Sequence, residues 1–236
     1  MLTLPRVAGL FYCPQSNDQG QMTGKEGKMS EMINAASKKK SDANAKVRWI
    51  ARTGILSGIA IVLMYLEFPI PLMPAFLKFD FAEVVALLGA FAMGPWTGLL
   101  IELIKNVSHL PFTNTAMTGE LANFLVCGSF VFLAGWIYQH NKSRKGAVIS
   151  MIAGTLMMTI MGVIVNYYIN LPFFMNVAGL NMDMIVGAVK ASGNMLVHDM
   201  KSLLAFVFVP FNIFKGIVVS TIVFLMYKKV SPLLHD

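Results

Sequence analysis

The sequence has little charge and none of the common catalytic motifs. Charged residues make up 13% of its 236 positions, against roughly 25% in soluble domains. It contains no Walker A sequence, no HExxH, no GxSxG and no EF-hand loop. We therefore expect a protein that is not an enzyme, and any ATP-driven process would need a partner that supplies the nucleotide site.

Cysteine and histidine are too few and too scattered to indicate a disulfide or a metal site. Cys13 lies in a polar segment and Cys127 in an apolar one, so we expect no bond between them. The four histidines, which show no ligand spacing, are His109, His140, His198 and His235. We expect neither a metal nor a cofactor.

Hydrophobic residues, in contrast, are abundant. They make up 56% of the chain, and the mean hydropathy is +0.64. This composition predicts an all-α integral membrane protein in the cell membrane. Hydropathy places six transmembrane helices in one bundle over residues 49–230. The expected spans are about 49–67, two sharing 81–104 with a break at Gly94-Pro95, 118–139, 147–170 and 203–227.

The stretch 81–104 could also be one kinked crossing, because each half reaches only about 18 Å against a core of about 30 Å. The distribution of positive charge favours six crossings. The tail together with Arg52, the loop at 142–145 and the C-terminal end then share one side, with nine, three and two of the 19 Lys and Arg. The positive-inside rule therefore predicts that both termini are cytoplasmic.

Residues 1–48 are polar and predict a disordered, basic cytoplasmic tail. No apolar segment follows a basic start, so we expect no signal peptide. The basic cluster consists of Lys38, Lys39, Lys40, Lys46, Arg48 and Arg52. Because it borders the first apolar span, it indicates membrane orientation rather than a nucleic-acid partner.

Lys215 lies near the middle of the last apolar run, where a lysine costs roughly 2.5–3.5 kcal/mol. Asn212, three residues earlier, projects from the same helix face, and Pro210 loosens the backbone hydrogen bonding there. This cluster predicts a polar ligand site within the membrane. Alternatively, Lys215 snorkels to the membrane surface, or it pairs with Glu102 or Glu120 for packing alone. For a ligand contact, we expect Lys215→Met to weaken binding while the ligand-free protein tolerates the change.

Other polar residues concentrate toward the same end of the bundle. Asn166 must find a partner, and Asn212 and Lys215 are candidates, whereas Glu102 and Lys105 are spaced to pair with each other. Aromatic residues that could flank a planar ligand are Phe124, Tyr167, Phe174 and Phe211. The connections 68–80, 105–117 and 171–202 are expected to cap the site, with an interfacial helix at about 181–192.

The first span carries small residues at helical spacing. Gly54 and Gly58 form a GxxxG pattern, with Ala51 one turn before. Such a pattern allows another helix to approach closely. The spacing alone fits a partner-binding face and packing inside the bundle equally well.

Five motifs together resemble the riboflavin-binding S component of energy-coupling factor (ECF) transporters. They are FPIPLMPAFLKFDFAEV (68–84), GPWTGLLIELIKN (94–106), GELANFL (119–125), VNYYINLP (165–172) and PFNIFKG (210–216). The resemblance implies six helices, a flavin site near the outer face, and a module of one transmembrane coupling subunit and two ATP-binding subunits. It also implies that riboflavin is a transported ligand rather than a cofactor.

The resemblance assigns roles to individual residues. Asn212, Lys215 and Asn166 match the family's ligand-binding residues, and Leu77, Lys78 and Phe79 match a loop that approaches the ligand through main chain. Its coupling-subunit contact is an Ala-x-x-x-Ala pattern, for which Gly54-x-x-x-Gly58 is the nearest match here. Three alternatives remain: an S component for thiamine, biotin or folate, an intramembrane enzyme, and a scaffold without a ligand.

Overall fold

The computed structural model describes residues 19–71, 73–74, 77–113, 117–177 and 179–234. The chain divides after Arg48 into two units, and the helix α1 (Gln19–Tyr65) runs through this boundary. Residues 19–48 are therefore helical where the sequence predicts disorder, and residues 1–18 lie outside the described residues. The division of the chain into a tail and a membrane domain stays a prediction.

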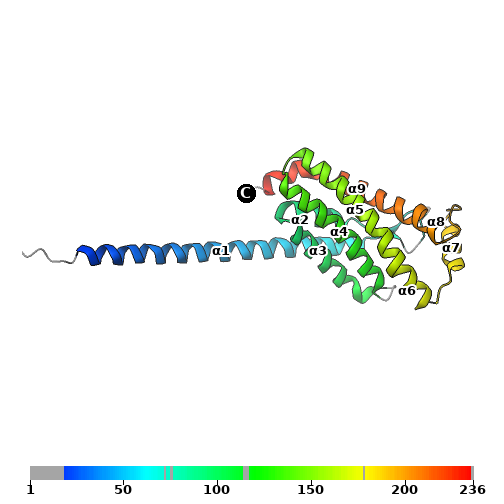
Figure 1. The fold of residues 1–236 in the computed structure, drawn as a ribbon, viewed down its shortest axis with the longest axis horizontal. Coiled ribbons are helices and arrows are strands. Elements are labelled where there is room, and N and C mark those ends of the chain that lie inside the picture. Colours follow the sequence, from blue (N-terminus) through cyan, green and yellow to red (C-terminus); the bar gives the residue numbers. More distant parts are fainter. Residues whose placement is uncertain (1–18, 72, 75–76, 114–116, 178, 235–236) are drawn as a thin grey trace, which may run out of the picture. The chain divides into compact units, whose positions relative to one another are not determined.

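The second unit is a bundle of helices (Figure 1). Its longer helices are α2 (Ala82–Met93), α3 (Pro95–His109), α4 (Thr118–His140), α5 (Arg144–Val165) and α9 (Val209–Leu234). The shorter ones are η1 (Leu110–Phe112), α6 (Leu171–Asn176), α7 (Met182–Ala191) and α8 (Met200–Leu203). Two π-helical turns, η2 (Asn166–Asn170) and η3 (Leu204–Phe208), continue α5 and precede α9. The helix predicted at about 181–192 is confirmed as α7, and its interfacial position stays a prediction.

Within the described residues, four helical segments are long and apolar enough to cross a membrane. They are Ser37–Tyr65, Thr118–His140, Arg144–Asn176 and Met200–Met226. The helix α2 is apolar but shorter. The predicted spans thus coincide with helices, whereas the count of six crossings is not decided by helix length.

The predicted break between α2 and α3 lies at Gly94. Its backbone has φ 103° and ψ 163°, a left-handed φ that favours glycine, and Pro95 follows at the first helical position, where no N–H is needed. Gln139 of α4 donates through Nε2 to the carbonyl oxygen of Phe91 at 3.0 Å, which satisfies a backbone group at the end of α2. The break is therefore held by the neighbouring helix.

Two apolar clusters form the interior of the bundle. The larger one joins α1, α2, α3, α4, α5 and α9. The smaller one brings Leu77 of the first connection together with Ile185 and Val189 of α7 and with Leu204 and Phe208 of η3. The connections thus pack into an ordered cap over one end of the bundle.

A β-hairpin and a helix capping box stabilise the connections that form this cap. Strand β1 (Phe68–Pro69) pairs antiparallel with β2 (Lys78–Phe79), which closes the first connection into a hairpin. Asp199 begins α8 with a capping box in which the Ser202 backbone N–H donates to its carboxylate at 2.8 Å. These hydrogen bonds from Ser202 hold the pKa of Asp199 below its usual value.

Candidate functional site

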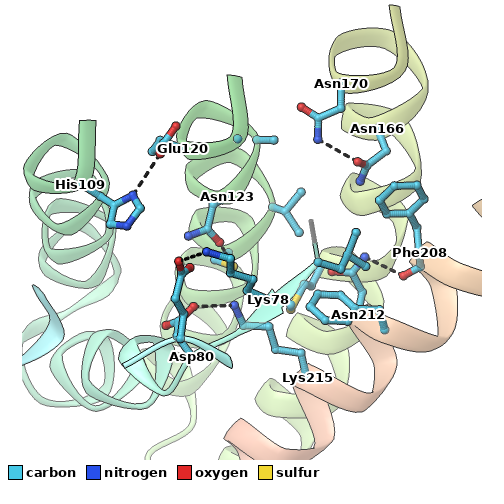
Figure 2. A pocket seen from close by; sticks show the side chains of 18 of the residues that line it. Lys78, Asp80, His109, Glu120, Asn123, Asn166, Asn170, Phe208, Asn212 and Lys215 are labelled. Atoms are coloured by element: carbon cyan, nitrogen blue, oxygen red, sulfur yellow. Dashed lines mark hydrogen bonds and ion pairs between the residues drawn. The ribbon is translucent and has the colours of Figure 1, made fainter. Parts of the chain in front are cut away.

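A cavity of about 570 Å³ lies between the bundle and the cap. Its wall includes side chains from the hairpin, α4, α5, η2, α6, α7 and α9. The wall is mainly apolar, and its polar residues include Lys78, Asp80, Asn123, Asn166, Asn170, Asn212 and Lys215 (Figure 2). An apolar cavity with a few convergent polar groups is typical of a small-molecule site.

The sequence-predicted asparagines both lie in the wall of this cavity. Asn166 and Asn212 are 6% and 4% exposed. Asn166 donates through Nδ2 to the Gly162 carbonyl at 2.7 Å, and Asn212 donates to the Phe208 carbonyl at 2.8 Å. The prediction that Asn166 pairs with Asn212 or Lys215 is wrong, because a backbone acceptor one turn away on its own helix is nearer.

Asn212 nevertheless meets α5. A Cβ atom at Gly162 would collide with the Asn212 side-chain amide. Because Gly162 has no side chain, the Asn212 side-chain amide of α9 can pack directly against the backbone of α5. This contact brings residues of α5 and α9 together at the cavity.

Lys215 is 3% exposed and is paired with two carboxylates. Its Nζ lies 3.2 Å from Asp80 Oδ2 and 3.0 Å from Glu83 Oε1. The alternative prediction that Lys215 pairs with Glu102 or Glu120 is therefore wrong, because its partners are Asp80 and Glu83. A lysine ammonium has three donors, and two of them point to these carboxylates, which leaves the third for a group in the cavity.

Lys105 extends the charged cluster. Its Nζ lies 2.7 Å from Glu83 Oε1 and 3.1 Å from Glu102 Oε2, so the predicted pairing of Glu102 with Lys105 is confirmed. All three side chains are fully buried. We call Asp80, Glu83, Glu102, Lys105 and Lys215 the buried charge cluster; buried charges persist only when paired in this way.

Sequence reasoning missed Asp80 and Glu83, although a signal was present. Both carboxylates lie at the start of the apolar stretch that forms α2, where each needs a cation or a donor. Asp80 accepts from the Ala82 backbone N–H at 2.8 Å. Lys105 directly follows the apolar stretch 81–104, and Lys215 is the one Lys or Arg within the later predicted spans. Matching these charges would have predicted the cluster.

The hairpin residues differ in their positions. Leu77 and Lys78 belong to the cavity wall, and Lys78 forms an ion pair with Glu67. Phe79 is 2% exposed, and its ring centroid lies 6.0 Å from Lys215 Nζ. Phe79 is thus close to the Lys215 ammonium without belonging to the cavity wall, and main-chain contact of this loop with a ligand stays a prediction.

The remaining wall combines aromatic and polar groups. Phe174 and Phe211, two of the four predicted aromatic residues, belong to the wall. His109 and Glu120 also belong to it, with 3.0 Å between His109 Nδ1 and Glu120 Oε1. These groups offer a planar ligand both apolar faces and polar edges.

The predicted partner face on α1 is open. Gly54, Gly58 and Ala51 are exposed, and a methyl group on either glycine would meet no heavy atom of the described residues within 4 Å. By contrast, Thr53 and Ser57 face the bundle at 3% exposure each. The glycines thus do not pack inside the described bundle, and their contact with a partner stays a prediction.

A helical bundle with apolar spans and an amide- and ammonium-lined cavity defines a substrate-binding membrane protein. Residues 48–227 match the family model of the substrate-specific component of the ECF transporter. The chain therefore belongs to the family of ECF transporter S components, and the resemblance seen in its motifs is confirmed. It is a multi-pass membrane protein of a transporter family rather than of an enzyme family.

Individual relatives agree with this assignment. Riboflavin transporter RibU of Staphylococcus aureus (strain TCH60) is 35% identical over 180 residues, covering 76% of this chain and 88% of that protein. Riboflavin transporter FmnP of Bacillus subtilis (strain 168) is 32% identical over 193 residues, covering 79% and 94%. A solved structure described as "Structure and mechanism of the S component of a bacterial ECF transporter" is 31% identical with a TM-score of 0.63, covering 81% of this chain and 99% of that chain.

Proposed function

We propose that this chain is the riboflavin-binding S component of an ECF-type vitamin uptake transporter, and that riboflavin occupies the cavity between the bundle and the cap. The observation that carries the proposal is the convergence of Asn166, Asn212 and Lys215 on one cavity. Its volume of about 570 Å³ lies within the range of about 300–1,000 Å³ usual for small-molecule sites. The names of the similar riboflavin transporters support the same ligand.

The wall suits the chemistry of riboflavin. The flavin has a flat apolar ring system with a polar edge and a ribityl chain of hydroxyl groups. Phe174 and Phe211 can cover the ring, while the third Lys215 donor and the asparagine amides satisfy oxygens that would otherwise be buried unpaired. Leu77 and Lys78 would cover the ligand from the hairpin side of the wall, and Phe79 would contact it through its main chain.

We further propose six membrane crossings with both termini cytoplasmic and the cavity near the outer face. The break at Gly94 supports two separate short crossings by α2 and α3, which α4 and α9 would shelter. The exposed face of Gly54 and Gly58 would receive a transmembrane coupling subunit, and two ATP-binding subunits would supply the energy. The isolated chain would then bind its ligand without pumping it.

A binding experiment on the purified protein tests the ligand. We expect a flavin absorption band in protein from riboflavin-fed cells and saturable quenching of flavin fluorescence on titration. Asn212→Leu should weaken binding about 5- to 150-fold, because it leaves ligand polar groups unmet. Ile213→Leu, on the neighbouring and partly exposed position, is the matched control. A wild-type protein that does not bind riboflavin would refute the proposal.

Competition separates riboflavin from the other vitamins. Thiamine, biotin and folate at excess should leave bound riboflavin in place. Displacement by one of them at lower concentration than unlabelled riboflavin would make that vitamin the substrate. Stable protein that retains no small molecule at all would instead favour a scaffold.

A further inference from the structure

Two chains of hydrogen-bonded asparagines lie at the cavity, and they end differently. On the side of α3 and α4, Asn106 donates to the Glu102 carbonyl at 2.8 Å, and Asn123 donates to Asn106 Oδ1 at 3.2 Å. The Cys127 thiol then donates to Asn123 Oδ1 at 2.9 Å. Every amide oxygen of this chain therefore has a donor within the protein.

The second chain runs along α5 and η2. Asn166 donates through Nδ2 to the Gly162 carbonyl at 2.7 Å, and Asn170 donates through Nδ2 to Asn166 Oδ1 at 2.8 Å. A backbone carbonyl can only accept, so it fixes which end of each amide faces which neighbour. The oxygen of Asn170 is thereby turned away from Asn166, as Figure 2 shows.

The second chain ends at Asn170 Oδ1, an acceptor that receives no hydrogen bond from the described residues. It is buried, while Asn170 itself belongs to the cavity wall. A buried acceptor without a donor is costly. It also lies on a π-helical turn, a local structure that occurs frequently at functional sites.

We propose that Asn170 is a further ligand-binding residue, whose Oδ1 accepts a hydrogen bond from bound riboflavin; this inference rests on the proposed function. The donor on the ligand is the imide N–H of the flavin ring or a ribityl hydroxyl. Lys215 can only donate, whereas the oriented Asn170 oxygen can only accept. Lys215 would thus bind an acceptor group of the ligand, and Asn170 would bind a donor group of the same ligand.

The test is a set of binding titrations with ligands that lack one donor each. Wild type and Asn170→Leu are titrated with riboflavin, with 3-methylriboflavin, which has no imide N–H, and with lumiflavin, which has no ribityl hydroxyls. Asn170→Leu should weaken riboflavin binding about 5- to 150-fold, as expected when one buried ligand donor loses its acceptor. The loss should vanish with the analogue that lacks the partner donor, which identifies that donor.

Controls separate a direct contact from a structural effect. Tyr168→Phe changes an exposed residue of the same π-helical turn and should leave all three affinities unchanged. If Asn170→Leu does not fold, Asn170→Ala is titrated with the same ligands. Equal losses for riboflavin and both analogues, or no loss, would overturn the proposal. Wild type that fails to bind riboflavin would refute the proposed function instead.

Discussion

At the scale of single residues, Lys215 has two tasks. It neutralises Asp80 and Glu83 at 3.2 and 3.0 Å, and it lies in the wall of the cavity. The desolvation cost of an intramembrane lysine is thus offset by partners rather than left for a ligand to relieve. The expectation that the ligand-free protein tolerates Lys215→Met ignored these partners, and it has to be reversed.

We expect Lys215→Met to weaken riboflavin binding and also to destabilise the ligand-free protein. Removing one member of a buried ion pair leaves the other uncompensated and costs roughly 3–5 kcal/mol. Fluorescence titration measures the first effect, and the melting temperature of the ligand-free protein in detergent measures the second. Lys201→Met, at an exposed position, is the matched control. A variant that melts at or above the wild-type temperature would contradict the paired arrangement.

At the scale of elements, the buried charge cluster ties the hairpin and α2 to α3 and α9. It contains three carboxylates and only two ammonium groups, all buried. Glu83 contacts both lysines, whereas Glu102 contacts only Lys105, at 3.1 Å. A buried cluster avoids uncompensated charge, so we expect the extra proton on Glu102.

A pair of amide substitutions tests this assignment. Glu102→Gln should change the free energy of unfolding by less than about 1 kcal/mol, because it replaces a neutral carboxyl by a neutral amide of the same shape. Glu83→Gln should cost about 3–5 kcal/mol, because both lysines lose their shared counter-ion. Thermal unfolding of the two ligand-free variants gives the comparison. Equal destabilisation would place the proton elsewhere or leave Glu102 ionised.

The helix α1 presents its glycines on an open face. We expect Gly54→Leu and Gly58→Leu to abolish riboflavin uptake in cells that contain the partner subunits, because bulk there prevents close helix approach. Riboflavin binding by the isolated variants should persist.

Gly98→Leu provides the contrast to these two substitutions. A Cβ atom at Gly98 would lie 2.5 Å from Val131 Cγ1, so a leucine should destabilise the fold and reduce binding together with uptake. Uptake by Gly54→Leu or Gly58→Leu at the wild-type rate would exclude this face as the contact.

At the scale of the whole molecule, the number of crossings decides which side of the membrane each connection faces. In a background without Cys13 and Cys127, we expect Lys142→Cys to react only from the cytoplasm and Ser192→Cys only from outside. The reason is that six crossings put the basic loop and the cap on opposite faces. Labelling of intact cells with a membrane-impermeant maleimide, before and after permeabilisation, measures this. Reaction of Lys142→Cys from outside and of Ser192→Cys from the cytoplasm, which five crossings from a cytoplasmic N-terminus predict, would refute six crossings, as would reaction of both cysteines from one side.

Much of the architecture follows from the sequence by itself. The spans, the break at Gly94-Pro95, the helix near 181–192 and the pairing of Glu102 with Lys105 depend on hydropathy, glycine and proline chemistry, and helical spacing. These are local properties, since each involves residues within a few turns of one another. The cost of a polar group in an apolar span likewise marked Asn166, Asn212 and Lys215 as functional candidates.

Tertiary structure decided which groups these residues meet. Lys215 reaches Asp80 across 135 positions of the chain, and the open end at Asn170 exists only because Asn166 is already held by a backbone carbonyl. Whether Gly54 faces a neighbour or open space also depends on how α1 is rotated against the bundle. Periodicity identifies a helix and its polar positions, whereas partners across helices are selected by packing and by the need to satisfy every buried charge and hydrogen bond.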